Sequence, residues 1–230
     1  MFPPGSLIRL VSAIVRAHLL NDMKMLSSYA NTNLTRNSNL THLPDGTTNF
    51  SAGIHSMTCV SIGYCENGKP VLGVIYAPGT KELYIAVKDY GAYRNGVKIQ
   101  QSHATKSLSK AVVCCEFGYA RDKAQVDKIL GGVSKIMLTG CRAIRQLGSG
   151  CLDLCMVATG RLDVVYAGLA SEGWKPWDYC AGWIICKEAG CVMESFDQKP
   201  GQDFDLYSKS IICGVSRELV DEVRKTILSK

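Results

Sequence analysis

Two carboxylates stand in settings that could support chemistry. Asp178 follows a rigid Lys-Pro-Trp approach at residues 175–177 and precedes a predicted helix with small residues in its first turns. A carboxylate fixed there lies beside backbone N–H groups and the positive end of the helix dipole, where phosphates also bind. Far upstream, Asp45 is followed by Gly46 and Thr47, whose N–H and hydroxyl groups could hold a phosphate. Together the two segments suggest metal-dependent phosphate-ester chemistry.

The elements that must position these carboxylates differ between the two halves of the chain. The first half shows β-branched and apolar runs separated by turn signals such as Asn67-Gly68, which is typical of an antiparallel meander over residues 56–99. These patterns predict strands at 56–64, 71–77, 82–88 and 111–116 and a helix at 123–134.

The second half alternates between strand and helix patterns. Strands are predicted at 143–147, 163–166, 192–195 and 210–214, and helices at 150–158, 178–189 and 217–228. Gly190 is well placed to end the helix that Asp178 begins. Antiparallel strands followed by alternating strands and helices indicate an α+β or layered α/β fold.

Composition excludes several classes of protein. The chain has 230 residues, of which 47% are hydrophobic and 20% charged, enough for one globular domain or two fused halves. No apolar run reaches the roughly 20 residues of a membrane span, so no membrane partner is expected. The net charge of +6 is spread along the chain without Lys/Arg runs, which argues against nucleic-acid binding.

The eleven cysteines show no C-x-x-C pair, and many lie inside apolar runs. This pattern predicts reduced, buried thiols in a reducing compartment, and we therefore expect a cytoplasmic protein. The four histidines are scattered, so no zinc cluster is predicted. Residues 7–29 have the spacing of an amphipathic helix, either a packed N-terminal helix or a transit peptide, followed by a polar loop.

The motifs identify a resemblance to a known family. The segments Pro44-Asp-Gly-Thr-Thr-Asn-Phe50 and Trp177-Asp-Tyr-Cys-Ala-Gly182, the latter followed by Glu188-Ala-Gly190, resemble the two signatures of the inositol monophosphatase family. The motifs between them, at residues 73–78, 91–96 and 148–163, occur in the family's order. The resemblance spans about residues 42–228.

The resemblance implies a layered α-β-α-β-α sandwich of the inositol monophosphatase and sugar phosphatase type. Residues 1–41 would form a divergent N-terminal helix and loop, and residues 42–230 the phosphatase-like domain. Within that domain, 42–140 would be the mostly antiparallel half and 141–230 the alternating half. It also implies Mg²⁺-dependent, lithium-sensitive hydrolysis of a small phosphorylated polyol, most simply inositol monophosphate, by a homodimer. Mg²⁺ prefers oxygen ligands, and two close metals can stabilise both the attacking and the leaving oxygen.

Family roles transfer to this sequence position by position. The metal ligands implied are Asp45, Asp178 and the backbone carbonyl of Pro44, with Asp45 and Thr47 as catalytic residues. Substrate-binding positions are implied throughout the two signatures and the loop before residue 150: Gly46, Thr47, Gly148, Ser149, Gly150, Glu172 and Asp178. From its pattern, Asp153 is read as a solvated or capping residue, with a functional role as the alternative, and Trp177 as a packing anchor.

Two departures from the family pattern stand out. His42 occupies the position of a metal-bridging Asp, and imidazole suits zinc or other transition metals better than Mg²⁺. Residues 1–41 contain one acidic residue, Asp22, and no glutamate, so the family's upstream acidic motif is missing. We therefore expect a shortened N-terminus and weak or absent phosphatase activity. The alternatives are a phosphatase for a nucleotide 3′-phosphate or histidinol phosphate, and an inactive relative that acts through protein interactions.

Overall fold

The first half of the chain folds into one antiparallel sheet. The computed structural model describes residues 40–100 and 105–229, and of residues 40–43 the backbone. Six strands follow one another in sequence order: β1 (Leu40–Asp45), β2 (Cys59–Glu66), β3 (Lys69–Ala77), β4 (Glu82–Val87), β5 (Gly91–Arg94) and β6 (Val97–Ile99). Two hairpins turn at Asn67-Gly68 and Asn95-Gly96, where all four residues have positive φ, as type I′ turns require.

A second, mixed sheet contains the remaining strands in the order β10-β11-β9-β7-β8. Its members are β7 (Val112–Glu116), β8 (Ala143–Arg145), β9 (Val164–Ala167), β10 (Val192–Glu194) and β11 (Ile211–Gly214). Strand β7 runs parallel to both β8 and β9, so the carboxyl ends of these three strands meet at one edge of the sheet. The change of sheet falls between β6 and β7, before the expected boundary at residue 140.

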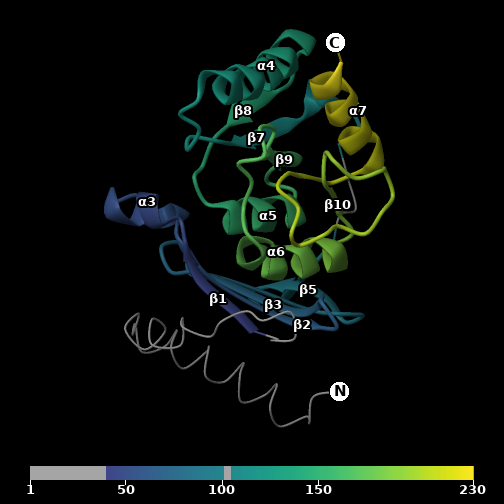
Figure 1. The fold of residues 1–230 in the computed structure, drawn as a ribbon. Helices are drawn as coiled ribbons and strands as arrows, with labels where there is room; N and C mark the ends of the chain where they lie inside the picture. Colours follow the sequence, from purple (N-terminus) through teal and green to yellow (C-terminus); the bar gives the residue numbers. More distant parts are fainter. Residues whose placement is uncertain (1–39, 101–104, 230) are drawn as a thin grey trace.

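Four longer helices in the described part of the chain complete the layers (Figure 1). Helices α5 (Gly150–Ala158) and α6 (Pro176–Ala189) lie between the two sheets, whereas α4 (Lys123–Thr139) and α7 (Arg217–Leu228) cover the far side of the second sheet. The described residues therefore form sheet, helix pair, sheet and helix pair. The first helical layer of the expected five, and the predicted helix over residues 7–29, lie outside the described residues.

Close approach of α6 to both neighbours explains why its middle turns are buried on all sides. A Cβ atom added at Gly73 of β3 would lie 2.5 Å from the carbonyl oxygen of Ala181, and one at Gly182 would lie 2.4 Å from Leu154 Cδ1. The residues between Tyr179 and Cys186 are all buried as a result. This packing fixes the start of α6, and with it Asp178, relative to the first sheet.

Local patterning predicted most of these elements. Every strand and helix predicted between residues 56 and 228 is present within a few residues, with α4 extending five residues further than expected. Four short elements of the described residues were not predicted: β1, α3 (Thr47–Ser51) and two 3₁₀ turns, at His55–Met57 and Leu108–Lys110. In the described part of the chain, no helix is long and apolar enough to cross a membrane.

Candidate active site

A pocket of about 800 Å³ opens where β1 ends and where α5 and α6 begin. Its walls come from four separate stretches of sequence. They are the turn from Pro44 to Asn49 with Ile54 and Met57, the segment Glu116–Tyr119 with Arg121, the loop residues Gln146–Gly148 and Gly150, and Trp174 with Asp178. The two carboxylates singled out in the sequence, Asp45 and Asp178, thus face one cavity although 133 positions separate them.

Asp45 is held by the N-terminus of α5. Its Oδ2 atom accepts hydrogen bonds from Ser149 Oγ at 2.5 Å and from the backbone N–H of Cys151 at 3.0 Å. The Cys59 thiol on the paired strand β2 approaches the same oxygen at 3.9 Å. Burial raises the pKa of Asp45, while these hydrogen bonds act in the opposite direction by stabilising the carboxylate.

Asp178 is the third residue of α6, and its Oδ2 atom accepts the backbone N–H of Lys175 at 2.7 Å. Pro176 fixes the first turn in a position where its missing N–H costs nothing. Burial raises the pKa of Asp178 to about 6, and the negative charge of Asp45 adds to this rise. The two carboxylates therefore repel each other across the pocket.

The turn after Asp45 requires glycine. Gly46 has φ +75°, and a Cβ atom there would lie 2.3 Å from the carbonyl oxygen of Met57. The short helix α3 follows and leaves Thr47 exposed on the pocket wall. Asn49 anchors this helix, because its side-chain amide donates to the carbonyls of Met57 at 3.1 Å and Leu147 at 2.8 Å.

The loop before α5 is shaped by contacts from two sides. Glu116, at the carboxyl end of β7, accepts the backbone N–H groups of Leu147 at 2.7 Å and Gly148 at 3.0 Å through one oxygen. Below the loop, the ring of Trp174 lies 2.8 Å from the place where a Gly150 Cβ would be, so only glycine fits without movement. The loop is thus held against α3 and above Trp174.

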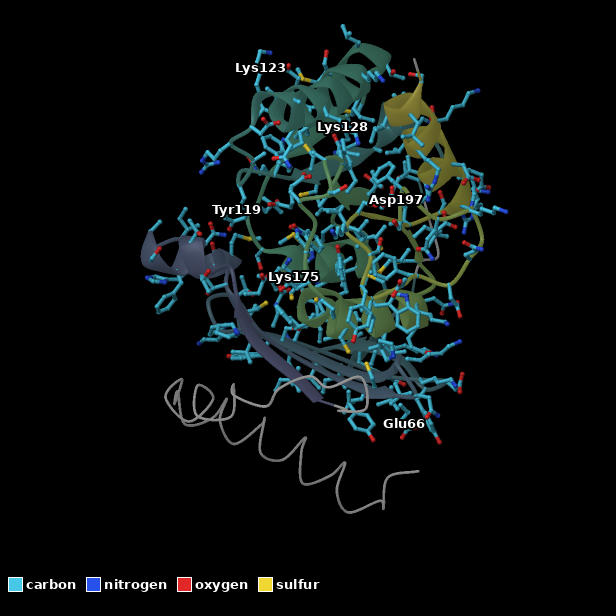
Figure 2. All side chains as sticks on the ribbon, in the orientation of Figure 1. Glu66, Tyr119, Lys123, Lys128, Lys175 and Asp197 are labelled. Atoms are coloured by element: carbon cyan, nitrogen blue, oxygen red, sulfur yellow. The ribbon has the colours of Figure 1, made fainter. Side chains whose placement is uncertain are left out.

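The far rim comes from the β7–α4 connection. Tyr119 marks this segment in Figure 2, and Lys175 marks the start of α6. Among the described residues that line the pocket, Arg121 is the one basic side chain, and it donates to the carbonyls of Gly118 and Ala120. The sequence analysis did not predict this rim. It could have been predicted from its position after a strand of a parallel sheet, since ligands bind outside the carboxyl ends of such strands.

Most predicted site residues meet at this pocket. Six of the predicted side chains or backbone positions line it, together with Pro44: Asp45, Gly46, Thr47, Gly148, Gly150 and Asp178. Ser149 is buried behind the wall and contacts Asp45. Glu172 is not among the lining residues, and its carboxylate accepts the N–H of Ala170 at 2.7 Å instead. His42 lies in β1, where its backbone pairs with Ile62 of β2. The side chain of His42 lies outside the described part of the structure.

Two further expectations from the sequence were wrong. Trp177 was expected to be a packing anchor, yet it is 37% exposed, and Trp174 packs under the loop instead. Asp153 was expected to be solvated or to cap a helix, yet it is completely buried in α5. Neither residue's position could be read from local sequence, because each depends on which face of its segment meets the core.

The donors present at the pocket fit a hard divalent cation. Asp45 and Asp178 offer carboxylate oxygens, and a cation between them would offset the repulsion that raises the pKa of Asp178. Pro44 lines the same wall and could contribute its carbonyl oxygen. These oxygen donors suit Mg²⁺, although two carboxylates form a smaller anionic set than the family pattern implies.

Comparison with known proteins agrees with this geometry. The model of the inositol monophosphatase family matches residues 45–228. Inositol monophosphatase 2 of Solanum lycopersicum is 41% identical over 167 residues, which cover 73% of this chain and 60% of the relative. Inositol monophosphatase 1 of Homo sapiens is 34% identical over 185 residues, covering 80% and 63%. The chain thus spans about six tenths of the length of these relatives.

Solved structures confirm the predicted fold. The inositol monophosphatase of Thermotoga maritima aligns with a TM-score of 0.70 and 32% identity over 83% of this chain and 68% of that one. The enzyme from Anabaena aligns with a TM-score of 0.71 and 29% identity over 85% and 76%. The match over most of the chain, with Asp45 and Asp178 at one pocket, shows that this protein belongs to the inositol monophosphatase family.

Proposed function

We propose that this protein hydrolyses a phosphate monoester, most simply inositol monophosphate to inositol and phosphate, in a reaction that depends on Mg²⁺. The observation that carries the proposal is the meeting of Asp45 and Asp178 in one pocket with the loop before α5. Family relatives named as inositol monophosphatases support the substrate class. A pocket of about 800 Å³ leaves room for a phosphorylated polyol.

The residues of the pocket would have different roles in the reaction. Asp45 and Asp178 would hold the cation, which when bound supplies positive charge to the phosphoryl oxygens and lowers the pKa of water. Thr47, exposed at the wall, is placed to orient a water molecule through its hydroxyl group. The backbone at Gly46 and Gly148 can approach the phosphate closely, because neither residue carries a side chain.

Two residues position the catalytic group Asp45. Ser149 and the N–H of Cys151 bind one carboxylate oxygen and fix its direction. These contacts also keep Asp45 ionised against the cost of burial, which a metal ligand requires.

The proposal includes weakened cation binding. His42 stands where the family resemblance calls for a carboxylate, and imidazole is a poor ligand for Mg²⁺. We therefore expect turnover to need more Mg²⁺ than a relative with the full set of carboxylates. A His42→Asp variant should lower the Mg²⁺ concentration for half-maximal activity by about 10-fold or more, by analogy with the effect of altered ligand shells.

Other features of the family remain predictions for this chain. Lithium sensitivity, a homodimeric state and a cytoplasmic location rest on the resemblance and on composition. The eleven cysteines are all thiols in the structure. A substrate with a second anionic group, such as a nucleotide 3′-phosphate, would find Arg121 on the rim.

The test is phosphate release from inositol monophosphate, nucleotide 3′-phosphate and histidinol phosphate across a Mg²⁺ series, with and without Li⁺. We expect release from inositol monophosphate, loss of release in Asp178→Asn, and an improved Mg²⁺ response in His42→Asp. A chain with no release from any substrate, even as His42→Asp at saturating Mg²⁺, would be the inactive relative and would refute the proposal. Preferential release from another substrate would correct the substrate and keep the reaction.

A further inference from the structure

A second cluster of potential ligands lies behind the pocket wall. Cys114 and Glu116 lie on β7, and Asp153 lies on α5. One ligand atom from each of the three side chains lies within 4.8 Å of the others. Cys114 and Asp153 are completely buried, whereas Glu116 is partly buried and reaches the pocket.

The Asp153 carboxylate lacks the partners that a buried acid needs. Both of its oxygens are buried, and neither has a hydrogen-bond partner. Burial above all raises its pKa well above the ordinary value, and the negative charges of Glu116 and Asp45 add to this rise. A buried carboxylate without donors is costly unless a proton or a cation compensates for it.

The spacing suits a cation with thiolate and carboxylate ligands. Around tetrahedral Zn²⁺, with Zn–S of about 2.3 Å and Zn–O of about 2.0–2.2 Å, sulfur and oxygen ligands lie about 3.5 Å apart. The Cys114 sulfur lies 3.5 Å from Glu116 Oε1, where its S–H group donates a hydrogen bond. Coordination would release this thiol proton to solvent and bring Asp153 into the same shell.

We propose that Cys114, Glu116 and Asp153 form a binding site for a thiophilic divalent cation such as Zn²⁺, separate from the oxygen-lined site of Asp45 and Asp178. Glu116 lines the pocket, so the cation enters and takes a water as fourth ligand from that side. Sulfur makes this site prefer Zn²⁺ or Co²⁺ over Mg²⁺. Since Glu116 also holds the N–H groups of Leu147 and Gly148, the bound cation would stiffen the loop before α5.

Cobalt is the direct probe, because a thiolate bound to Co²⁺ gives a near-ultraviolet charge-transfer band. The full chain, stripped with a chelator and kept reduced, is titrated with Co²⁺ in excess Mg²⁺. We expect one equivalent of Co²⁺ to produce the band and Zn²⁺ to abolish it. Absence of the band in the unaltered protein would overturn the proposal.

Two variants assign the site, and a third is the matched control. Cys114→Ser should remove the band, and Asp153→Asn should weaken Co²⁺ binding by at least about 10-fold. Cys59→Ser should keep the band, although Cys59 belongs to the other group of nearby ligands, with Asp45 and Cys151. A band that survives Cys114→Ser, or that disappears in Cys59→Ser alone, would contradict the assignment.

Thermal melting distinguishes the loss of metal binding from the misfolding of a variant. Asp153→Asn keeps the shape and removes the buried acid, so without metal at neutral pH it should melt at or above the temperature of the unaltered protein. Zn²⁺ should raise the melting temperature of the unaltered protein and leave that of Asp153→Asn nearly unchanged. An equal rise in both proteins would refute the site, independently of any phosphatase activity.

Discussion

The pocket carboxylates Asp45 and Asp178 and the buried carboxylate of Asp153 behind them differ in how the chain supports them. Asp45 and Asp178 each accept a backbone N–H at the start of a helix, from Cys151 in α5 and from Lys175 immediately before α6. Asp153 lies only two residues beyond Cys151 in α5, yet no hydrogen bond reaches its oxygens. The protein therefore provides N–H donors to the carboxylates of Asp45 and Asp178, but it provides none to the carboxylate of Asp153.

The difference follows from the geometry of helix α5. The N–H groups of a helix's first turn have no partner inside the helix and can serve a carboxylate that arrives from outside. From Asp153 onward these groups are used, since the Asp153 N–H itself bonds to the Ser149 carbonyl. A carboxylate that the helix itself carries and turns into the core, as at Asp153, therefore needs a proton or a cation, whereas one that accepts a free N–H group at a helix start is stabilised in its ionised form. Four substitutions test this contrast.

The largest effect on phosphate release is expected when the negative charge of Asp45 is removed. Asp45→Asn keeps the shape and the contacts with Ser149 and Cys151 but loses the negative charge that holds the cation. Mg²⁺-dependent phosphate release should fall more than about 100-fold, since even outer-shell changes cost about 10–100-fold. The control is Asp127→Asn, which alters only an exposed pair with Lys123. Comparable losses in both variants would show that Asp45 has no special role.

Asp178→Asn should also lower Mg²⁺-dependent phosphate release and yet stabilise the metal-free protein. Its folded pKa of about 6 lies above the ordinary value of 3.8, so ionisation costs folding free energy once the pH exceeds 3.8. A shift of about 2 units corresponds to about 3 kcal/mol at pH 8, about half of that at pH 5 and almost none at pH 3. Urea unfolding in chelator at these three pH values measures the gain. A gain independent of pH would contradict its electrostatic origin.

Much of the fold was predictable because its signals are local. Turn pairs such as Asn67-Gly68, alternating apolar residues and helix boundaries such as Gly190 all act within a few positions. The pairing of Asp45 with Asp178 came from the order of the two motifs, which the resemblance supplied. The short helix α3 escaped prediction because five residues carry too little pattern.

The parts of the site that were not predicted from the sequence depend on contacts between segments that are far apart in the chain. Nothing near Glu116 shows that it holds a loop more than 30 residues away. Similarly, Trp174 and Trp177 differ by three positions, and only the packing against Gly150 decides which ring is covered. The burial of Asp153 was missed for the same reason, because an acidic residue in a helix usually faces solvent.

A smaller effect is expected when the loop that supports Asp45 is pushed outward. Gly150→Ala would place a methyl group 2.8 Å from the Trp174 ring, and such overpacking costs about 1–3 kcal/mol. Gly131→Ala is the matched control, because nothing lies within 4 Å of its added Cβ in helix α4. That control should gain up to about 1 kcal/mol through helix propensity. If both substitutions changed the free energy of unfolding in the same direction, the close contact between Gly150 and Trp174 would be contradicted.

The smallest effect concerns Glu116, which supports the loop by its charge. Glu116→Gln keeps an oxygen for the N–H groups of Leu147 and Gly148 but makes both hydrogen bonds neutral, which should cost about 1 kcal/mol in chelator. Glu188→Gln is the control, although Glu188 accepts the N–H of Asp89 through one oxygen and that of Gly91 through the other, so the new amide NH2 would face one of these two donors. Glu188→Gln should therefore lose at least as much stability, but only Glu116→Gln should raise KM, since only its loop lines the pocket. If Glu188→Gln raised KM equally, the effect would belong to general stability, and the loop would not depend on Glu116 for substrate binding.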